Sequence, residues 1–175
     1  TYKIHDNIGM WLDKSCLQYF GSTAAPSILS FYPALGVKRD VRSEPELSNY
    51  ALRGLLSVEY LITTPEKQTD FENEAKDGYA VYRNTNYVPM GFAYDYYLTQ
   101  TEYEETAKAT RANMLMRALV LTDEDAAVYG KYLTHLPEGR REELYYESYV
   151  QDCRERRATA ASVFQMNNSG FHAEI

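Results

Sequence analysis

The chain is poor in the residues from which metal centres and nucleophilic active sites are usually built. Its 175 residues include two cysteines, Cys16 and Cys153, and three histidines, His5, His135 and His172, all far apart in sequence. This set lacks the spacing of zinc ligands, and no histidine accompanies a recognisable serine or cysteine nucleophile. We therefore expect no metal site, and the sequence leaves open whether the cysteines form a disulfide.

Basic residues are in the minority. Lysine and arginine number 18 against 25 aspartates and glutamates, which gives a formal net charge of -7 and an isoelectric point of about 5.0. They are scattered and form no basic stripe that could neutralise phosphates, so the composition argues against nucleic acid as a partner. The most strongly patterned part of the chain, residues 50–92, contains no phosphate-binding loop, and we expect no cofactor.

Charge is missing altogether from Ser15 to Val37, a stretch long enough to span a bilayer. The stretch contains Pro26 and Pro33, two glycines and several hydroxyl residues, which interrupt the continuous apolar helix that lipid requires. We predict a buried or partly buried loop and short helix here, and no membrane span.

The two ends of the sequence lack the features of natural termini. The chain begins at Thr1 without a methionine or a signal sequence, and it stops at Ile175 within an alternating apolar pattern. We expect a segment excised from a longer protein.

Apolar residues, in contrast, make up 45% of the chain, enough for the core of one domain over residues 1–175. Alternating patterns in the middle followed by helical spacing predict an α+β fold, a small mixed β-sheet with several packed helices. We expect strands at 2–5, 58–62, 79–83, 91–98 and on both sides of a turn at 168–170. We expect helices at 26–35, after capping boxes at 43–46 and 101–104, after a cap at 122, and at 141–157, with 65–77 as a solvated connection.

Tyrosine is the residue in excess, with 17 copies against one tryptophan and six phenylalanines. Its large ring and polar tip suit half-buried positions, interfaces and sugar stacking. Because most tyrosines fall on pattern positions, we favour a packing role over a binding role.

Carboxylates are plentiful but do not indicate catalysis. The clusters Glu102–Glu105 and Asp123–Asp125 each begin an expected helix, where capping and the helix dipole account for them. His135 is expected at a helix end, where its charge needs no catalytic explanation. We predict no catalytic residues.

The loop-rich opening supplies the candidate ligand-binding residues, Asn7, Trp11, Tyr19 and Ser22. Amide, indole and hydroxyl groups close together could recognise a sugar by stacking and hydrogen bonds. The same residues could equally be a buried tryptophan with satisfied polar neighbours, and we favour this second interpretation.

An ordered set of motifs covers nearly the whole chain. The longest is YALRGLLSVEYLIT at 50–63. The others are DNIGMW at 6–11, LQYFGS at 17–22, SFYP at 30–33, LGV at 35–37, RDV at 39–41, VYRN at 81–84, YVPMGF at 87–92, RALVL at 117–121, RATA at 157–160 and GF at 170–171. In this order the set resembles the extracytoplasmic part of YfhO-type bacterial membrane proteins, except that Glu59 stands where the family typically has a basic residue.

The resemblance implies a polytopic membrane protein similar to GT-C-type glycosyltransferases, which use lipid-linked sugars to decorate cell-envelope polymers such as teichoic acids. In such enzymes the catalytic carboxylate lies on an early loop between membrane helices, so no catalytic residue is carried over to this chain. The resemblance implies a soluble, non-catalytic extracytoplasmic domain that positions or selects the acceptor. Its partners would be the transmembrane part of its own parent protein and a cell-envelope glycan or teichoic-acid-like polymer.

Two other functions remain open from the residues alone. A stand-alone carbohydrate-binding or protein-interaction module would use the tyrosines and Trp11 as its contact surface. A soluble hydrolase would need a carboxylate pair, for which the sequence offers no spacing.

Overall fold

The computed structural model describes residues 7–43, 45, 48–63, 71–76, 79–167 and 169–175. They contain helices, antiparallel strand pairs and parallel strand pairs, which confirms the predicted α+β class. The chain divides into two compact units. Unit 1 consists of residues 1–49 and 60–85, and unit 2 of residues 50–59 and 86–175.

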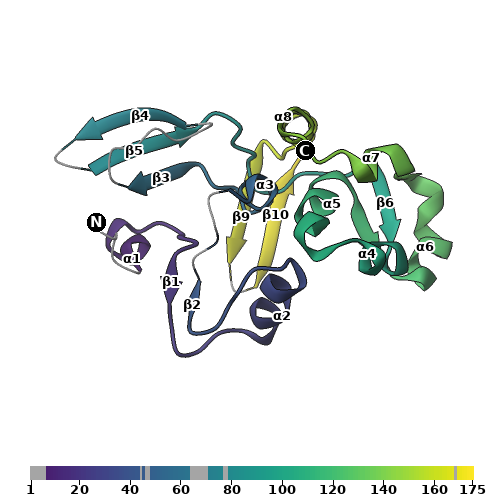
Figure 1. Ribbon diagram of the computed structural model, residues 1–175, viewed down its shortest axis with the longest axis horizontal. Coiled ribbons are helices and arrows are strands. Elements are labelled where there is room, and N and C mark those ends of the chain that lie inside the picture. The colour runs from purple at the N-terminus through teal and green to yellow at the C-terminus, as the bar shows by residue number, and fades with distance from the viewer. Residues whose placement is uncertain (1–6, 44, 46–47, 64–70, 77–78, 168) are drawn as a thin grey trace. The chain divides into compact units, whose positions relative to one another are not determined.

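Unit 1 contains two antiparallel sheets. The larger sheet has the order β3-β5-β4, with β3 at Tyr60–Thr63, β4 at Phe71–Lys76 and β5 at Tyr79–Asn84 (Figure 1). Ala80 and Tyr82 of the central strand are buried, as expected for a strand paired on both sides. The smaller sheet pairs β1, Tyr19–Phe20, with β2, Arg42–Ser43.

Two helices accompany the smaller sheet of unit 1. Helix α2, Pro26–Ala34, begins with Pro26 in its first turn, where the missing N–H of proline costs no hydrogen bond. Tyr32 and Leu35 are buried while Ile28 and Leu29 are exposed, so the uncharged stretch is partly buried, as predicted. Helix α1, Ile8–Leu12, lies in the region predicted to be loop-rich.

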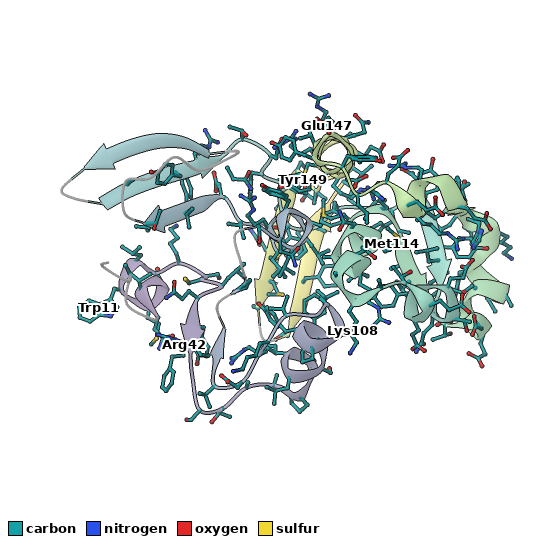
Figure 2. All side chains as sticks on the ribbon, viewed as in Figure 1. Trp11, Arg42, Lys108, Met114, Glu147 and Tyr149 are labelled. Atoms are coloured by element: carbon teal, nitrogen blue, oxygen red, sulfur yellow. The ribbon has the colours of Figure 1, made fainter. Side chains whose placement is uncertain are left out.

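Three helices pack together in unit 2. They are α3, Tyr50–Leu55, α5, Arg111–Arg117, and α8, Tyr146–Ala158. Gly54 permits the close approach, because a Cβ at this position would lie 2.9 Å from Met116 Cε. Met114 on α5 belongs to the neighbouring core cluster with Leu98, Ala118 and Leu136 (Figure 2).

A buried ion pair joins α5 to α8. Arg117 Nε donates to Asp152 Oδ2 at 2.8 Å, and both side chains are almost inaccessible to solvent. The other two guanidinium nitrogens of Arg117 donate to the carbonyls of Arg140 and Glu143 at 2.5 and 2.6 Å. Burial raises the pKa of Asp152 above its ordinary value, and the charge of Arg117 opposes this rise. Arg117 therefore ties α5 to helix α7, Glu138–Glu142, and to its C-cap residue Glu143.

The larger sheet of unit 2 is parallel and has the order β7-β6-β8. Its strands are β6, Tyr96–Thr99, β7, Leu119–Leu121, and β8, Thr134–His135. The connection from β6 to β7 contains α4, Gln100–Glu105, η1, Lys108–Thr110, and α5; that from β7 to β8 contains α6, Asp123–Tyr129, and η2, Gly130–Tyr132. Helices α4 and α6 both contact β6 and β7.

A hairpin closes unit 2. Strands β9, Val163–Asn167, and β10, Gly170–Glu174, pair antiparallel around the predicted turn. Phe164 of this hairpin packs against Gly91, which has φ +79°, and a Cβ at Gly91 would lie 2.4 Å from the Phe164 ring. A side chain at residue 91 would be strained by the positive φ and would clash with the Phe164 ring.

Several predicted boundaries are wrong. The expected solvated connection 65–77 includes strand β4 at 71–76, which lies at the edge of its sheet. Of the strand expected at 91–98, only the last part forms a strand, which is β6 at Tyr96–Thr99. The expected helix after residue 101 stops at Glu105, where Arg111 donates to the carbonyls of Glu104 and Thr106, and it resumes as α5.

The later helices also begin and end elsewhere than predicted. Thr122 caps α6 as expected, accepting from the Asp125 N–H, but the helix ends at Tyr129. The helix predicted at 141–157 is divided into α7 and α8. The predicted strand 2–5 and the capping box at 43–46 lie outside the described residues and side chains.

Candidate functional site

The parallel sheet of unit 2 gathers polar side chains at one edge. Strand β6 is central, and the chain leaves it toward β7 on one side and later returns to β8 on the other. In parallel sheets, ligands bind outside the carboxyl ends of the strands, where the strand order reverses in this way. Here that point lies between Thr99, the last residue of β6, and His135, the last residue of β8.

The local sequence after β6 fixes the position of Glu102. Thr99 is the N-cap of α4, and its hydroxyl accepts from the Glu102 N–H at 3.2 Å. The Glu102 carboxylate in turn accepts from the Thr99 N–H at 3.0 Å, which completes a capping box. The predicted box at 101–104 was thus placed two residues too late, and Thr101 instead donates its hydroxyl to Asp123 at 2.9 Å.

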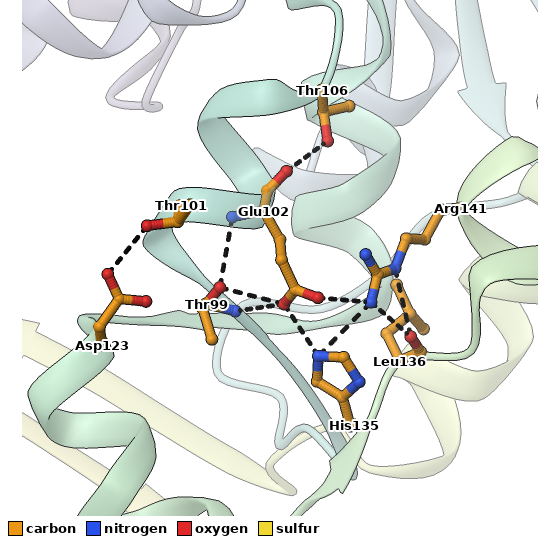
Figure 3. A network of polar contacts seen from close by, with 8 residues as sticks. All are labelled: Thr99, Thr101, Glu102, Thr106, Asp123, His135, Leu136 and Arg141. Atoms are coloured by element: carbon orange, nitrogen blue, oxygen red, sulfur yellow. Dashed lines mark hydrogen bonds and ion pairs between the residues drawn. The ribbon is translucent and has the colours of Figure 1, made fainter.

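Two basic side chains converge on the same carboxylate (Figure 3). His135 Nε2 lies 2.8 Å from Glu102 Oε2, and Arg141 Nη2 lies 2.8 Å from Glu102 Oε1. Arg141 also donates to the carbonyl of Leu136, and the His135 ring lies 5.1 Å from the Tyr97 ring. We name Thr99, Glu102, His135 and Arg141 the Glu102 cluster.

Electrostatics hold the carboxylate of the Glu102 cluster in its ionised form. Desolvation on partial burial favours the neutral acid, but hydrogen bonds from the Thr99 backbone, His135, Arg141 and the Thr99 hydroxyl outweigh it. They lower the pKa of Glu102 to about 2. A group that ionises so far below neutral pH has no proton to give and is a weak base. Its physical role is therefore to orient His135 and Arg141.

The basic groups of this cluster have different accessibility. The His135 side chain is 46% exposed, whereas those of Glu102 and Arg141 are each 23% exposed. The imidazole, together with the edge of the guanidinium, is thus the part that a solute can reach. The guanidinium donates hydrogen bonds and the imidazole can donate or accept them, which suits hydroxyl, carboxylate or phosphate oxygens.

The structure places the four predicted ligand-binding residues in unit 1. Asn7 has φ 64°, and its amide both donates to the Phe20 carbonyl and accepts from the Phe20 N–H, each at 2.8 Å. Trp11 on α1 is 90% exposed, so the interpretation as a buried tryptophan is wrong. Tyr19 and Ser22 are also exposed. Sugar binding by these residues stays a prediction.

The sequence did not predict that His135 and Arg141 converge on Glu102. His135 was expected at a helix end without a partner, but it ends strand β8 and contacts Glu102. The available signal was local, namely the spacing Thr99-X-X-Glu102 directly after an apolar strand. The partners His135 and Arg141 are more than 30 residues away, and only the parallel pairing of β6 with β8 brings them close.

Other kinds of site find no support in the part of the chain that the structure describes. Its histidine, cysteine and acidic residues form no group able to hold a metal ion. Both cysteines are thiols, with Cys16 exposed and Cys153 buried.

The fold and the polar cluster define the general class of this protein. The chain is an α+β protein with a polar cluster at the carboxyl edge of a small parallel sheet, and none of its described helices has the length and apolarity needed to cross a bilayer. The family model described as bacterial membrane protein YfhO matches residues 1–169, and the chain belongs to this family. Neither the curated proteins nor the solved structures include a significant match.

Proposed function

We propose that this chain is a non-catalytic extracytoplasmic domain of a polytopic membrane protein, and that it positions or selects the acceptor for transfer of a lipid-linked sugar. Membership of a bacterial membrane protein family supports the first part. The resemblance to GT-C-type glycosyltransferases supports the second. The transmembrane part of the same protein is its permanent partner, and the acceptor is a cell-envelope glycan or a teichoic-acid-like polymer.

The observation that carries the acceptor role is the arrangement of the Glu102 cluster. Its carboxylate is fully engaged and has a pKa of about 2, so it orients its neighbours and does not exchange protons during catalysis. The exposed His135 and the adjoining Arg141 remain as hydrogen-bonding groups at a sheet edge where ligands commonly bind. Such groups suit a polymer that is rich in hydroxyl and phosphate oxygens.

Deletion tests the role of the whole domain. Residues 1–175 are removed from the full-length membrane protein and replaced by a short flexible linker, and membrane insertion is checked by protease accessibility. We expect envelope glycosylation to be lost while the protein still inserts. The isolated domain should show no turnover of lipid-linked sugar. Normal glycosylation by the inserted deletion variant would contradict the proposal.

A point variant tests the Glu102 cluster itself. His135→Gln in the full-length protein keeps a polar side chain but removes the imidazole, and we expect envelope glycosylation to fall. His172→Gln is the matched control, because His172 is also exposed and pairs with a glutamate, Glu174, at 3.1 Å. We expect the control to retain glycosylation. Equal activity of both variants would remove His135 from acceptor binding.

A further inference from the structure

The opening segment of unit 1 exposes apolar side chains that its own fold leaves uncovered. Met10, Trp11 and Leu12 are consecutive on α1 and are 77%, 90% and 50% exposed. Figure 2 shows Trp11 directed away from the ribbon of α1. Three consecutive exposed apolar residues are disfavoured on a surface that meets only water, so a run of this kind indicates a contact.

Hydrogen bonds fix this short helix next to further exposed apolar residues. The Asn7 amide makes two bonds to the Phe20 backbone, which ties the start of α1 to strand β1. Gly21 donates from its N–H to the Val41 carbonyl at 2.9 Å, which ties the residue after β1 to the residue before β2. Phe20 and Val41 are themselves exposed. We name Met10, Trp11, Leu12, Phe20 and Val41 the Trp11 surface.

The charge of the surrounding segment differs in sign from that of the chain. Residues 7–43 contain four basic residues and two acidic ones, although the whole chain carries a net charge of -7. The basic residues are Lys14, Lys38, Arg39 and Arg42, and Lys14 follows α1 within two positions. Tryptophan and aliphatic side chains next to lysine and arginine are typical of segments that lie at a membrane–water interface.

We propose that the Trp11 surface inserts into the interfacial region of a lipid bilayer, with the neighbouring basic residues facing anionic headgroups. Membership of a membrane protein family places a bilayer within reach of this chain. A sugar is a poorer fit, because a sugar site needs polar groups around the ring, and the nearby Asn7 amide is already engaged with Phe20. The inference rests on family membership and does not depend on the proposed acceptor role.

The lone tryptophan provides a direct measurement. The 175-residue chain is mixed with unilamellar vesicles of phosphatidylglycerol and phosphatidylethanolamine, and Trp11 emission is recorded. We expect a blue shift, together with quenching by lipids brominated near the headgroup end of the acyl chain. Vesicles of phosphatidylcholine alone should bind more weakly. Unchanged emission with every vesicle would overturn the proposal.

Moving the probe controls for nonspecific adsorption. In the double variant Trp11→Phe with Tyr132→Trp, the tryptophan occupies an exposed position on η2 of unit 2. Phenylalanine preserves apolar contact at residue 11, so this variant should still sediment with vesicles, but its emission should stay unchanged. An equal blue shift from residue 132 would indicate general adsorption and contradict the assignment to the Trp11 surface.

Two further variants separate apolar from electrostatic contact. Met10→Ser with Leu12→Ser should weaken vesicle binding by about tenfold or more, since each exposed apolar side chain contributes on the order of 1 kcal/mol when buried. Lys14→Glu should weaken binding to anionic vesicles by about fivefold or more and leave binding to neutral vesicles nearly unchanged. Circular dichroism establishes that both variants are folded. Unaltered vesicle binding by the folded Met10→Ser/Leu12→Ser variant would refute the lipid assignment. A blue shift of Trp11 emission with envelope glycan but not with vesicles would also refute it.

Discussion

Replacing Glu102 by glutamine separates the two tasks of this side chain. Glutamine keeps a carbonyl oxygen that can accept from the Thr99 N–H, so the capping box is preserved. It removes the negative charge that faces His135 and Arg141, each 2.8 Å away. The variant therefore reports on the ion pair with Arg141 and the contact with His135, and not on the start of helix α4.

The expected loss of stability follows from the geometry of those pairs. Exposed ion pairs contribute about 0.2–1 kcal/mol each, and hydrogen bonds to charged groups contribute about 1.5–3 kcal/mol. Since the Glu102 side chain is 23% accessible and partly screened by solvent, we expect a total loss of about 1–2 kcal/mol, between these limits. For a chain of this size, that corresponds to a decrease in Tm of about 2–8 °C.

The pH dependence of this difference has a definite sign. In the folded chain the pKa of Glu102 is lowered to about 2 from an ordinary value of 4.5. A lowered pKa stabilises the fold fully above the unfolded value, and this stabilisation is lost as the pH falls toward the folded value. The difference between wild type and Glu102→Gln should therefore be constant near neutral pH and should shrink from pH 4.5 downward.

Urea unfolding of both chains at pH 7, 5 and 3 measures this difference. Glu174→Gln is the matched control, because Glu174 and its partner His172 are both exposed, and we expect a change of less than about 0.5 kcal/mol. A difference for Glu102→Gln that is negligible at pH 7, or that grows as the pH falls, would refute the electrostatic role assigned to Glu102.

Three further predictions concern the framework around this site. Thr99→Ala should cost about 1 kcal/mol through loss of the N-cap and Thr101→Ala less than half of this, and equal losses in urea unfolding would contradict the observed cap. Arg117→Met should cost about 3–5 kcal/mol because it leaves a buried carboxylate without its main partner, and a loss below 1 kcal/mol in the same assay would be inconsistent with that burial. In a thiol titration, Cys16 should react in the native chain and Cys153 only after denaturation; two fast native thiols, or none, would disagree with the structure.

Local signals in the sequence predicted the elements that depend on neighbouring residues. Pro26 marks the start of α2, Thr122 caps α6, and the strands expected on both sides of 168–170 pair as the final hairpin. Each of these features is specified within a few residues, so the chain pattern is sufficient. Strand β4 was missed because an acidic strand at a sheet edge has the composition of a solvated loop.

The candidate site depends on contacts that sequence patterns do not contain. Glu102 meets His135 and Arg141 only because β6 and β8 pair in parallel, although one strand, three α-helices and two 3-10 helices separate them in sequence. The burial of Trp11 was predicted wrongly for a different reason. A lone tryptophan is usually largely buried, whereas here a five-residue helix tied down by Asn7 presents it to solvent.

The ionisation of the Glu102 cluster also bears on where chemistry would occur in a longer protein. A pair of carboxylates that works by acid–base catalysis needs environments that drive the two pKa values apart, with one of them near the working pH. Glu102 has instead been driven far below it by cationic and hydrogen-bond partners. What the cluster offers to solvent is a guanidinium and an imidazole held at fixed positions, a property suited to recognising an oxygen-rich molecule. If the parent protein transfers a sugar, its reactive carboxylate must therefore be sought outside this cluster.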